Sequence, residues 1–84
     1  MEKAFFLYGN ERIEVDHESL TGAQIKAAIK AHDHHADTAF DLVLEGHGHD
    51  ADKVIPDDQS VDLAIGGGDG GPKRFFLRPP TNFG

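Results

Sequence analysis

The chain has 84 residues, the length of one small domain with a single core of modest size. It contains no cysteine, which excludes a disulfide framework, a thiol nucleophile and thiolate metal sites. Eight Lys and Arg against fifteen Asp and Glu give a formal net charge of −7, which argues against nucleic acid or an anionic membrane surface as a partner. No apolar run approaches a membrane span and the residues after Met1 form no signal peptide, so we expect a cytoplasmic protein.

Two runs near the N-terminus predict a β-hairpin. Residues 4–8, AFFLY, are aromatic and apolar, a composition that favours a strand. Residues 11–16 alternate Ile13 and Val15 with charged residues, which is typical of a half-exposed strand. The pair Gly9-Asn10 between the runs suits the positive φ angles of a tight hairpin turn.

The next segment predicts a helix that begins after Thr21. Thr21 and Gln24 have the spacing of a capping box, and Leu20 and Ile25 have the spacing of a hydrophobic staple. Gly22 in the first turn is a mild fault, because glycine in a helix interior costs about 1 kcal/mol relative to alanine.

The apolar periodicity of this helix stops near residues 32–35. Its apolar face is formed by Ile25, Ala28 and Ile29. We expect Lys26 and Lys30 to point to solvent.

The second half of the chain predicts strands separated by polar turns. In residues 38–45, Phe40, Leu42 and Leu44 fall on one face and Val43 on the other. The remaining segments are a short strand at 53–55, a turn at 56–60, a stretch in which Val61, Leu63 and Ile65 return to the core, a glycine loop at 66–71 and a last strand at 73–78.

This order predicts an α+β domain of the β-grasp type over residues 1–78. A mixed sheet of four to five strands packs one face on the single helix, so that both elements bury their apolar sides. The first and last strands pair at the centre of such a sheet. We therefore expect Phe5 or Phe6 to contact Phe75 or Phe76.

Clusters of polar residues offer no convincing catalytic or metal site. Histidine and aspartate gather in residues 31–37 and 46–50, but no HExxH spacing occurs and we interpret them as surface residues. The loop GGGDGG at 66–71 leads into Pro72 and a strand and not into a helix N-terminus that would bind phosphate. The aspartate pairs lie in predicted turns and the two serines have no neighbouring base, so we expect neither group to form a catalytic site. We expect no enzyme, no resident cofactor and no metal.

The segment KRFFLRPPTNFG, residues 73–84, is the most informative stretch of the chain. Pro79 and Pro80 favour extended polyproline II geometry directly after the predicted strand. The tail then carries an apolar side chain, Phe83, and ends on Gly84. A carboxylate on glycine has no neighbouring Cβ, so it is an accessible acyl group. Ordinary fraying of a chain end is the competing interpretation.

With its predicted β-grasp order and glycine-terminated tail, the chain resembles ubiquitin and its relatives. The segments DLVLEG and VIPDDQSVDL parallel the second half of ubiquitin in order and length. The closing KRFFLRPPTNFG resembles the end of the bacterial multi-ubiquitin-domain family, whose genes lie beside those of activating enzymes, conjugating enzymes and deubiquitinase-like peptidases.

This resemblance implies a protein modifier. An activating enzyme would use ATP to adenylate the Gly84 carboxylate, which would pass as a thioester to a conjugating enzyme and then to an amine of a target protein. The deubiquitinase-like peptidase would be a further partner, and a bacterial antiphage operon the expected setting. Tail recognition would involve Arg78, Pro79, Pro80 and Phe83 of the conjugation tail 79–84. Phe75, Phe76 and Leu77 would tie that tail to the core.

Two other functions remain open from the residues alone. A sulfur carrier uses the same fold and the same acyl-adenylate chemistry, but a Gly-Gly end is expected there and Phe83 stands in its place. A non-covalent binding or assembly module would use a sheet face or an edge strand, including pairing with copies of itself.

Overall fold

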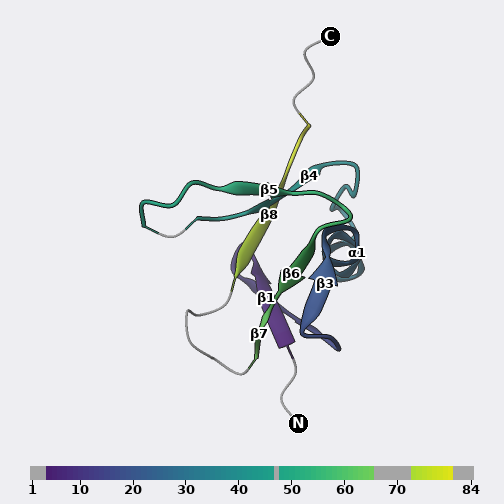
Figure 1. Ribbon diagram of the computed structural model, residues 1–84. Coiled ribbons are helices and arrows are strands. Elements are labelled where there is room, and N and C mark those ends of the chain that lie inside the picture. The colour runs from purple at the N-terminus through teal and green to yellow at the C-terminus, as the bar shows by residue number, and fades with distance from the viewer. Residues whose placement is uncertain (1–3, 47, 66–72, 81–84) are drawn as a thin grey trace.

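The computed structural model describes residues 4–46, 48–65 and 73–80. It is an α+β domain in which a mixed sheet packs on one helix, as predicted (Figure 1). The elements are β1 (Ala4–Tyr8), β2 (Glu11–Val15), β3 (Ser19–Thr21), α1 (Gly22–His32), β4 (Asp41–Leu44), β5 (Lys53–Ile55), β6 (Ser60–Asp62), β7 (Ala64–Ile65) and β8 (Arg74–Arg78).

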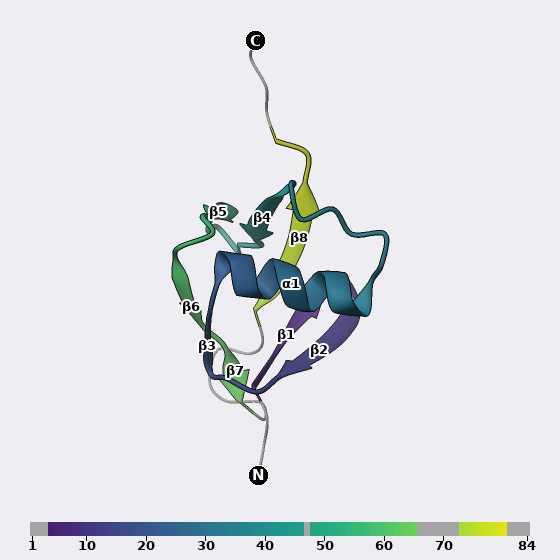
Figure 2. The same ribbon diagram turned by 90° about the vertical axis from the view of Figure 1, so that its right-hand side faces the viewer.

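The sheet has the strand order β2-β1-β8-β4-β5, and β7 pairs with the start of β1. The first and last strands lie side by side at its centre and are parallel, with Leu7 opposite Arg74 and Tyr8 opposite Phe75. The other described pairings are antiparallel. Helix α1 crosses one face of this sheet (Figure 2). The arrangement is that of a β-grasp-like fold, with the predicted contact between the first and last strands.

The predicted N-terminal hairpin is present, and its turn is set by Gly9. This glycine has φ +61°, and among the described residues only glycines have a positive φ. A two-residue loop with a positive φ only at its first position is the type II′ turn, which matches the right-handed twist of the flanking strands. Gly9 therefore provides the one left-handed conformation that the hairpin requires.

The start of α1 confirms the predicted capping box. The Gln24 amide donates to Thr21 Oγ1 at 3.3 Å, and the Thr21 amide donates to Gln24 Oε1 at 2.9 Å. These bonds satisfy backbone donors that a helix start otherwise leaves unpaired. Leu20 and Ile25, the predicted staple residues, are both buried in the same core cluster.

The interpretation of Gly22 as a mild fault was wrong. Gly22 is the first residue of α1, is buried, and donates its amide to the Gln59 carbonyl at 3.0 Å. A Cβ placed on it would lie 2.9 Å from the Pro56 carbonyl carbon and would overlap the Pro56 oxygen. Glycine is used here because the turn after β5 approaches the helix backbone closely.

The expectation that Lys26 points to solvent was also wrong. Only 11% of its side chain is exposed, and its Nζ lies 2.9 Å from Oδ1 of Asp57 in the turn after β5. Lys30 is exposed, and its Nζ donates to the carbonyls of His34 at 2.6 Å and Ala36 at 2.9 Å. The helix ends at His32, as predicted. Lys30 thus binds the loop that follows the helix.

The strand predicted over residues 38–45 is shorter, because it is preceded by a turn. The Phe40 amide donates to the Asp37 carbonyl at 3.0 Å, and the Ala39 amide donates to Asp37 Oδ1 at 2.9 Å. These bonds hold residues 37–40 in a turn, so β4 begins only at Asp41. Phe40 is half-buried but lies outside the strand.

A second, two-stranded sheet was not predicted. Strand β3, which leads directly into α1, pairs antiparallel with β6, with Leu20 opposite Val61. The Ser19 and Ser60 hydroxyls lie 2.7 Å apart, and the Leu63 amide donates to the Glu18 carbonyl at 2.7 Å. Val61 and Leu63 are buried, as predicted. The pairing connects the start of the helix to the second half of the chain.

The core lies between α1 and the sheet. Its buried members are Ala4, Phe6, Ile13, Leu20, Ile25, Ile29, Ala36, Leu42, Ile55, Val61, Leu63 and Phe75. Phe5 and Val43 are also buried but do not belong to this cluster. The Arg12 guanidinium lies 3.9 Å from the centre of the Phe5 ring. A cation in that position is attracted by the ring and also shields it from water.

Candidate functional site: the last strand and its exit

The predicted site begins in β8, which pairs with β1 at Arg74 and Phe75 and with β4 from Phe75 to Arg78. The Leu7 amide of β1 donates to the Lys73 carbonyl at 2.8 Å, and the Glu45 amide donates to the Arg74 carbonyl at 2.9 Å. On the β4 side the register continues to the end of the strand, where Arg78 lies opposite Asp41. The backbone that leads to the tail is therefore held on both sides at Arg74 and Phe75, and on the β4 side from Phe76 to Arg78.

The three aromatic and aliphatic residues of β8 lie on alternate faces of the sheet. Phe75 is fully buried in the helix-side core, and Leu77 packs against the same cluster. Phe76 is half-buried and lies opposite Val43 in the register with β4. The segment predicted to tie the tail to the core therefore contacts both faces, with its largest buried side chain on the helix side.

Beyond β8 the described chain leaves the sheet. Arg78, the last residue of the strand, is exposed, and so are Pro79 and Pro80, which belong to no element. Their trace leads away from the helix and the sheet (Figure 2). Two predicted site residues, Phe83 and Gly84, lie outside the described residues, as does the predicted glycine loop at 66–71.

A row of apolar side chains crosses the sheet beside this exit, on the face away from α1. Val54 of β5 lies opposite Val43 of β4, which in turn lies opposite Phe76 of β8. Val43 is fully buried, whereas 46% of Val54 is exposed. This row was not predicted from the sequence, because three strands contribute to it. The one indication in the sequence was that Val43 falls on the face of its strand opposite to Leu42 and Leu44.

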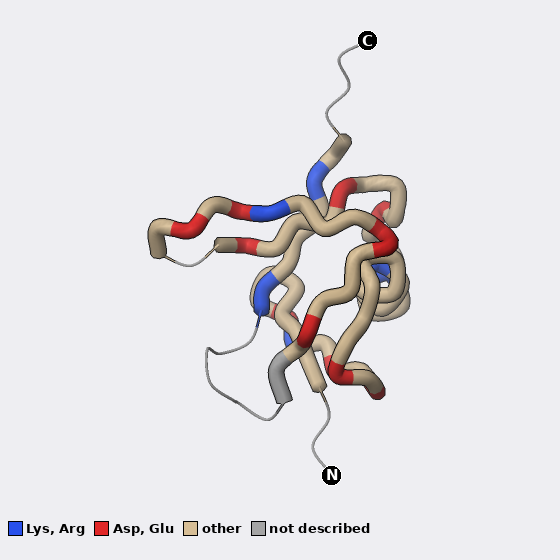
Figure 3. The backbone as a smooth tube through the Cα atoms, in the orientation of Figure 1, with Lys and Arg blue, Asp and Glu red and all other residues tan. Residues whose placement is uncertain are grey.

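Basic residues accompany the row. Arg74 and Arg78 are the first and last residues of β8, lie on the same face of the strand as Phe76, and are exposed. The backbone tube shows basic positions at both ends of this strand (Figure 3). Arg74 lies 3.9 Å from Glu45, with both side chains nearly half exposed, so this ion pair contributes little to stability. Each arginine of β8 therefore has an acidic neighbour, Glu45 beside Arg74 and Asp41 opposite Arg78.

The histidines form no metal centre within the described residues. No group of three or more His, Asp or Glu side chains there is arranged to hold a metal ion. His32, His34, His35 and His49 are exposed, and His47 lies outside the described residues. His32 Nε2 lies 3.4 Å from Glu11 Oε2, and this contact is an ion pair only when the imidazole is protonated.

In the same described part of the chain, no helix is both long enough and apolar enough to cross a membrane. No protein-family model matches the chain, and comparison with curated proteins and with solved structures finds no significant match either.

Proposed function

We propose that the chain is a ubiquitin-like protein modifier that acts in the cytoplasm and is activated at the Gly84 carboxylate. The carboxylate would attack the α-phosphate of ATP on an activating enzyme, releasing pyrophosphate and forming an acyl adenylate. A cysteine thiolate of the enzyme would displace AMP, and the thioester would pass to a conjugating enzyme. An amine of the target would then displace that thiolate to form an amide bond. The chain itself supplies no catalytic group.

The observation that carries the proposal is the way in which β8 leads to the tail. Its backbone is hydrogen-bonded to β1 at its start and paired with β4 as far as Arg78, and Phe75 is fully buried below it. Arg78, Pro79 and Pro80 follow immediately and are exposed. A domain that passes its own carboxylate through an enzyme channel needs this abrupt change from a fixed strand to an accessible segment. Proline also limits the conformations that the segment loses on entering the channel.

The test uses the full chain with ATP, Mg²⁺ and the activating and conjugating enzymes of its host. We expect a thioester adduct that disappears on treatment with a thiol reductant. Deleting Gly84 should abolish it, whereas Gln59→Ala, an exposed change in the turn before β6, should leave it unchanged. If the Gly84-deleted chain forms the same adduct, or if the wild type forms none, the proposal is wrong.

A second function, a non-covalent binding module, is favoured by the row Val54–Val43–Phe76. The partly exposed Val54 at the edge strand β5 gives this face an apolar contact point. A Val54→Asp variant should then lose partner binding and biological activity, while deletion of Gly84 should leave both intact. A sulfur carrier is distinguished by intact mass spectrometry, because a terminal thiocarboxylate replaces one oxygen of the free protein with sulfur.

A further inference from the structure

Strand β2 forms one edge of the sheet and has an open side. It pairs with β1 along its whole length, from Ala4 opposite Val15 to Tyr8 opposite Glu11. Among the described strands it has no other neighbour. An open edge presents unpaired backbone donors and acceptors, and it can add a strand from another chain.

The hydrogen bonds of β1 show which groups of β2 face this open side. The Leu7 amide donates to the Lys73 carbonyl of β8, so Leu7 directs its backbone groups away from β2. Leu7 lies opposite Arg12, and this pair is therefore a non-hydrogen-bonded one. Arg12 and, two residues on, Glu14 accordingly direct their N–H and C=O groups to the open edge.

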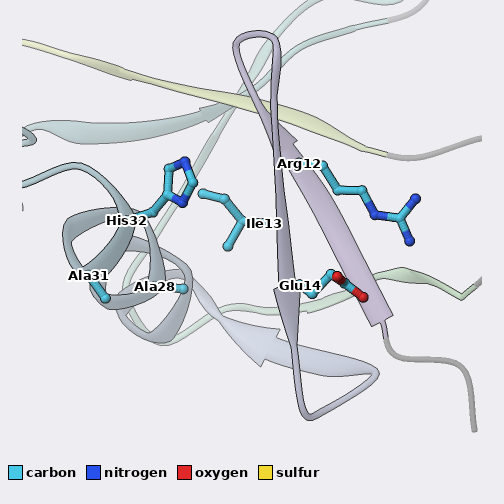
Figure 4. Close-up of a pocket in the computed structure, with 6 residues that line it drawn as sticks. All are labelled: Arg12, Ile13, Glu14, Ala28, Ala31 and His32. Carbon is cyan, nitrogen blue, oxygen red and sulfur yellow. The ribbon is translucent and has the colours of Figure 1, made fainter.

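A groove runs between this edge and α1. Its volume is ≈ 320 Å³, and it is lined by Arg12, Ile13, Glu14, Ala28, Ala31 and His32 (Figure 4). Ile13 points toward the helix, whereas Arg12 and Glu14 point to the other face of the sheet. The helix contributes the methyl groups of Ala28 and Ala31 and, at its last residue, the exposed side chain of His32. The small side chains at Ala28 and Ala31 leave space beside the middle of β2.

The charges along β2 are self-complementary about Ile13. The strand reads Glu-Arg-Ile-Glu-Val, with Arg12 and Glu14 placed symmetrically on either side of Ile13. In an antiparallel pairing of two copies centred on Ile13, Arg12 of each copy lies opposite Glu14 of the other. Opposite charges in directly opposed cross-strand positions stabilise a pair, and like charges destabilise it.

We propose that the open edge of β2 binds β2 of a second copy, giving a two-fold symmetric dimer with one continuous sheet. Arg12 and Glu14 then form both the hydrogen-bonded backbone pairs and the cross-strand ion pairs. A two-fold axis perpendicular to the sheet passes between the two Ile13 residues and leaves both helices on one face. The grooves merge, and the Ala28 and Ala31 methyl groups allow the helices to approach each other.

Two further observations favour a second copy as the occupant. Edge strands commonly avoid such pairing through charged side chains, proline or a bulge. Strand β2 has no proline and no bulge, and its charged residues Arg12 and Glu14 have opposite signs, so they attract in this pairing. The new edge is also separated from β8 by β1, so the dimer leaves Arg78 and the proposed conjugation tail accessible. Dimerisation therefore stands or fails independently of the proposed function.

Charge reversal tests the pairing by analytical ultracentrifugation of the full chain. Arg12→Glu makes positions 12 and 14 both acidic, and Glu14→Arg makes both basic. We expect each variant alone to raise the dimer dissociation constant by at least about tenfold, because two cross-strand attractions become repulsions. Mixing the two variants should restore association as a heterodimer, and the double variant Arg12→Glu/Glu14→Arg should restore the homodimer.

Two substitutions at exposed positions serve as controls, because they change the net charge by the same amounts as Arg12→Glu and Glu14→Arg. Lys53→Glu on the opposite edge strand β5 and Asp58→Arg in a turn should leave the dissociation constant unchanged. Arg12→Glu also removes the cation above Phe5, so its fold is checked by thermal unfolding and by an NMR spectrum of its backbone amides. Glu14→Arg retains the contact between Arg12 and Phe5. A wild type that stays monomeric at about 1 mM would overturn the proposal, and the open edge of β2 would then be a site for a different protein. So would a mixture of the two variants that forms no heterodimer.

Discussion

The rings of Phe6 and Phe75 meet edge to face at the centre of the core, with their centroids 5.5 Å apart and their planes at 90°. Phe6 lies on the first strand and Phe75 on the last, and both are fully buried. The contact therefore joins segments from opposite ends of the chain. A force applied to the tail reaches this pair through β8, after the pairing of Phe76 to Arg78 with β4 and the packing of Leu77 on the core.

A double-mutant cycle on Phe6→Leu and Phe75→Leu should measure this contact. We expect a coupling of about 0.5–1.5 kcal/mol in the free energy of unfolding, because edge-to-face aromatic pairs stabilise beyond the area that they bury. Urea denaturation of the four proteins gives the value. The matched cycle on Phe5→Leu and Phe75→Leu should give a coupling near zero, because Phe5 is outside the core cluster that contains Phe75. Equal couplings in both cycles would contradict the assignment.

Gly22→Ala should destabilise the domain although alanine is the better helix former. In an unobstructed helix interior the change stabilises by about 0.5–1 kcal/mol. Here the new Cβ overlaps the carbonyl oxygen of Pro56, so the turn after β5 must move away from the helix start. We expect a net loss of about 1–3 kcal/mol, typical of overpacking a close contact. Thermal and urea unfolding should both detect it.

Gly9→Ala provides the comparison for Gly22→Ala. A Cβ on Gly9 meets no atom within 4 Å, so its cost arises only from the positive φ of the turn. That cost is about 1–2 kcal/mol and should be smaller in Gly9→Asn, because asparagine accepts a positive φ more readily than alanine does. Gly22→Asn should show no such recovery. If Gly22→Ala proved as stable as the wild type, the close approach to Pro56 would not limit the helix start.

The parts of the fold that were predictable from sequence rest on local patterns. Thr21 and Gln24 are three residues apart, so the capping box needs no tertiary information. The two-stranded sheet was not predictable in this way, because β3 and β6 are three residues long and have no distinctive periodicity. The burial of Lys26 depends in the same way on Asp57, which reaches it only through the fold.

The candidate site divides along the same line. The tail was predictable from local composition, because two prolines directly after an aromatic strand indicate that the strand ends there. The row Val54–Val43–Phe76 and the open edge of β2 depend on which strands are neighbours and in which register. Sequence periodicity gives the face of each strand separately. It does not give the register that places Val54, Val43 and Phe76 opposite one another.

Arg78 should distinguish recognition of the tail from stability of the domain. If activating or conjugating enzymes bind the exit from β8, Arg78→Ala should slow thioester formation about tenfold, the effect of losing one charge-assisted hydrogen bond. Its free energy of unfolding should stay within about 0.5 kcal/mol of the wild type, because Arg78 is exposed at the end of the strand. Arg74→Ala, four positions earlier on the same strand and also exposed, is the matched control. Equal slowing by both variants would indicate a general need for positive charge and not recognition of the exit. If neither variant slows the reaction, Arg78 has no part in tail recognition. The proposed chemistry at Gly84 is tested separately, by deleting Gly84.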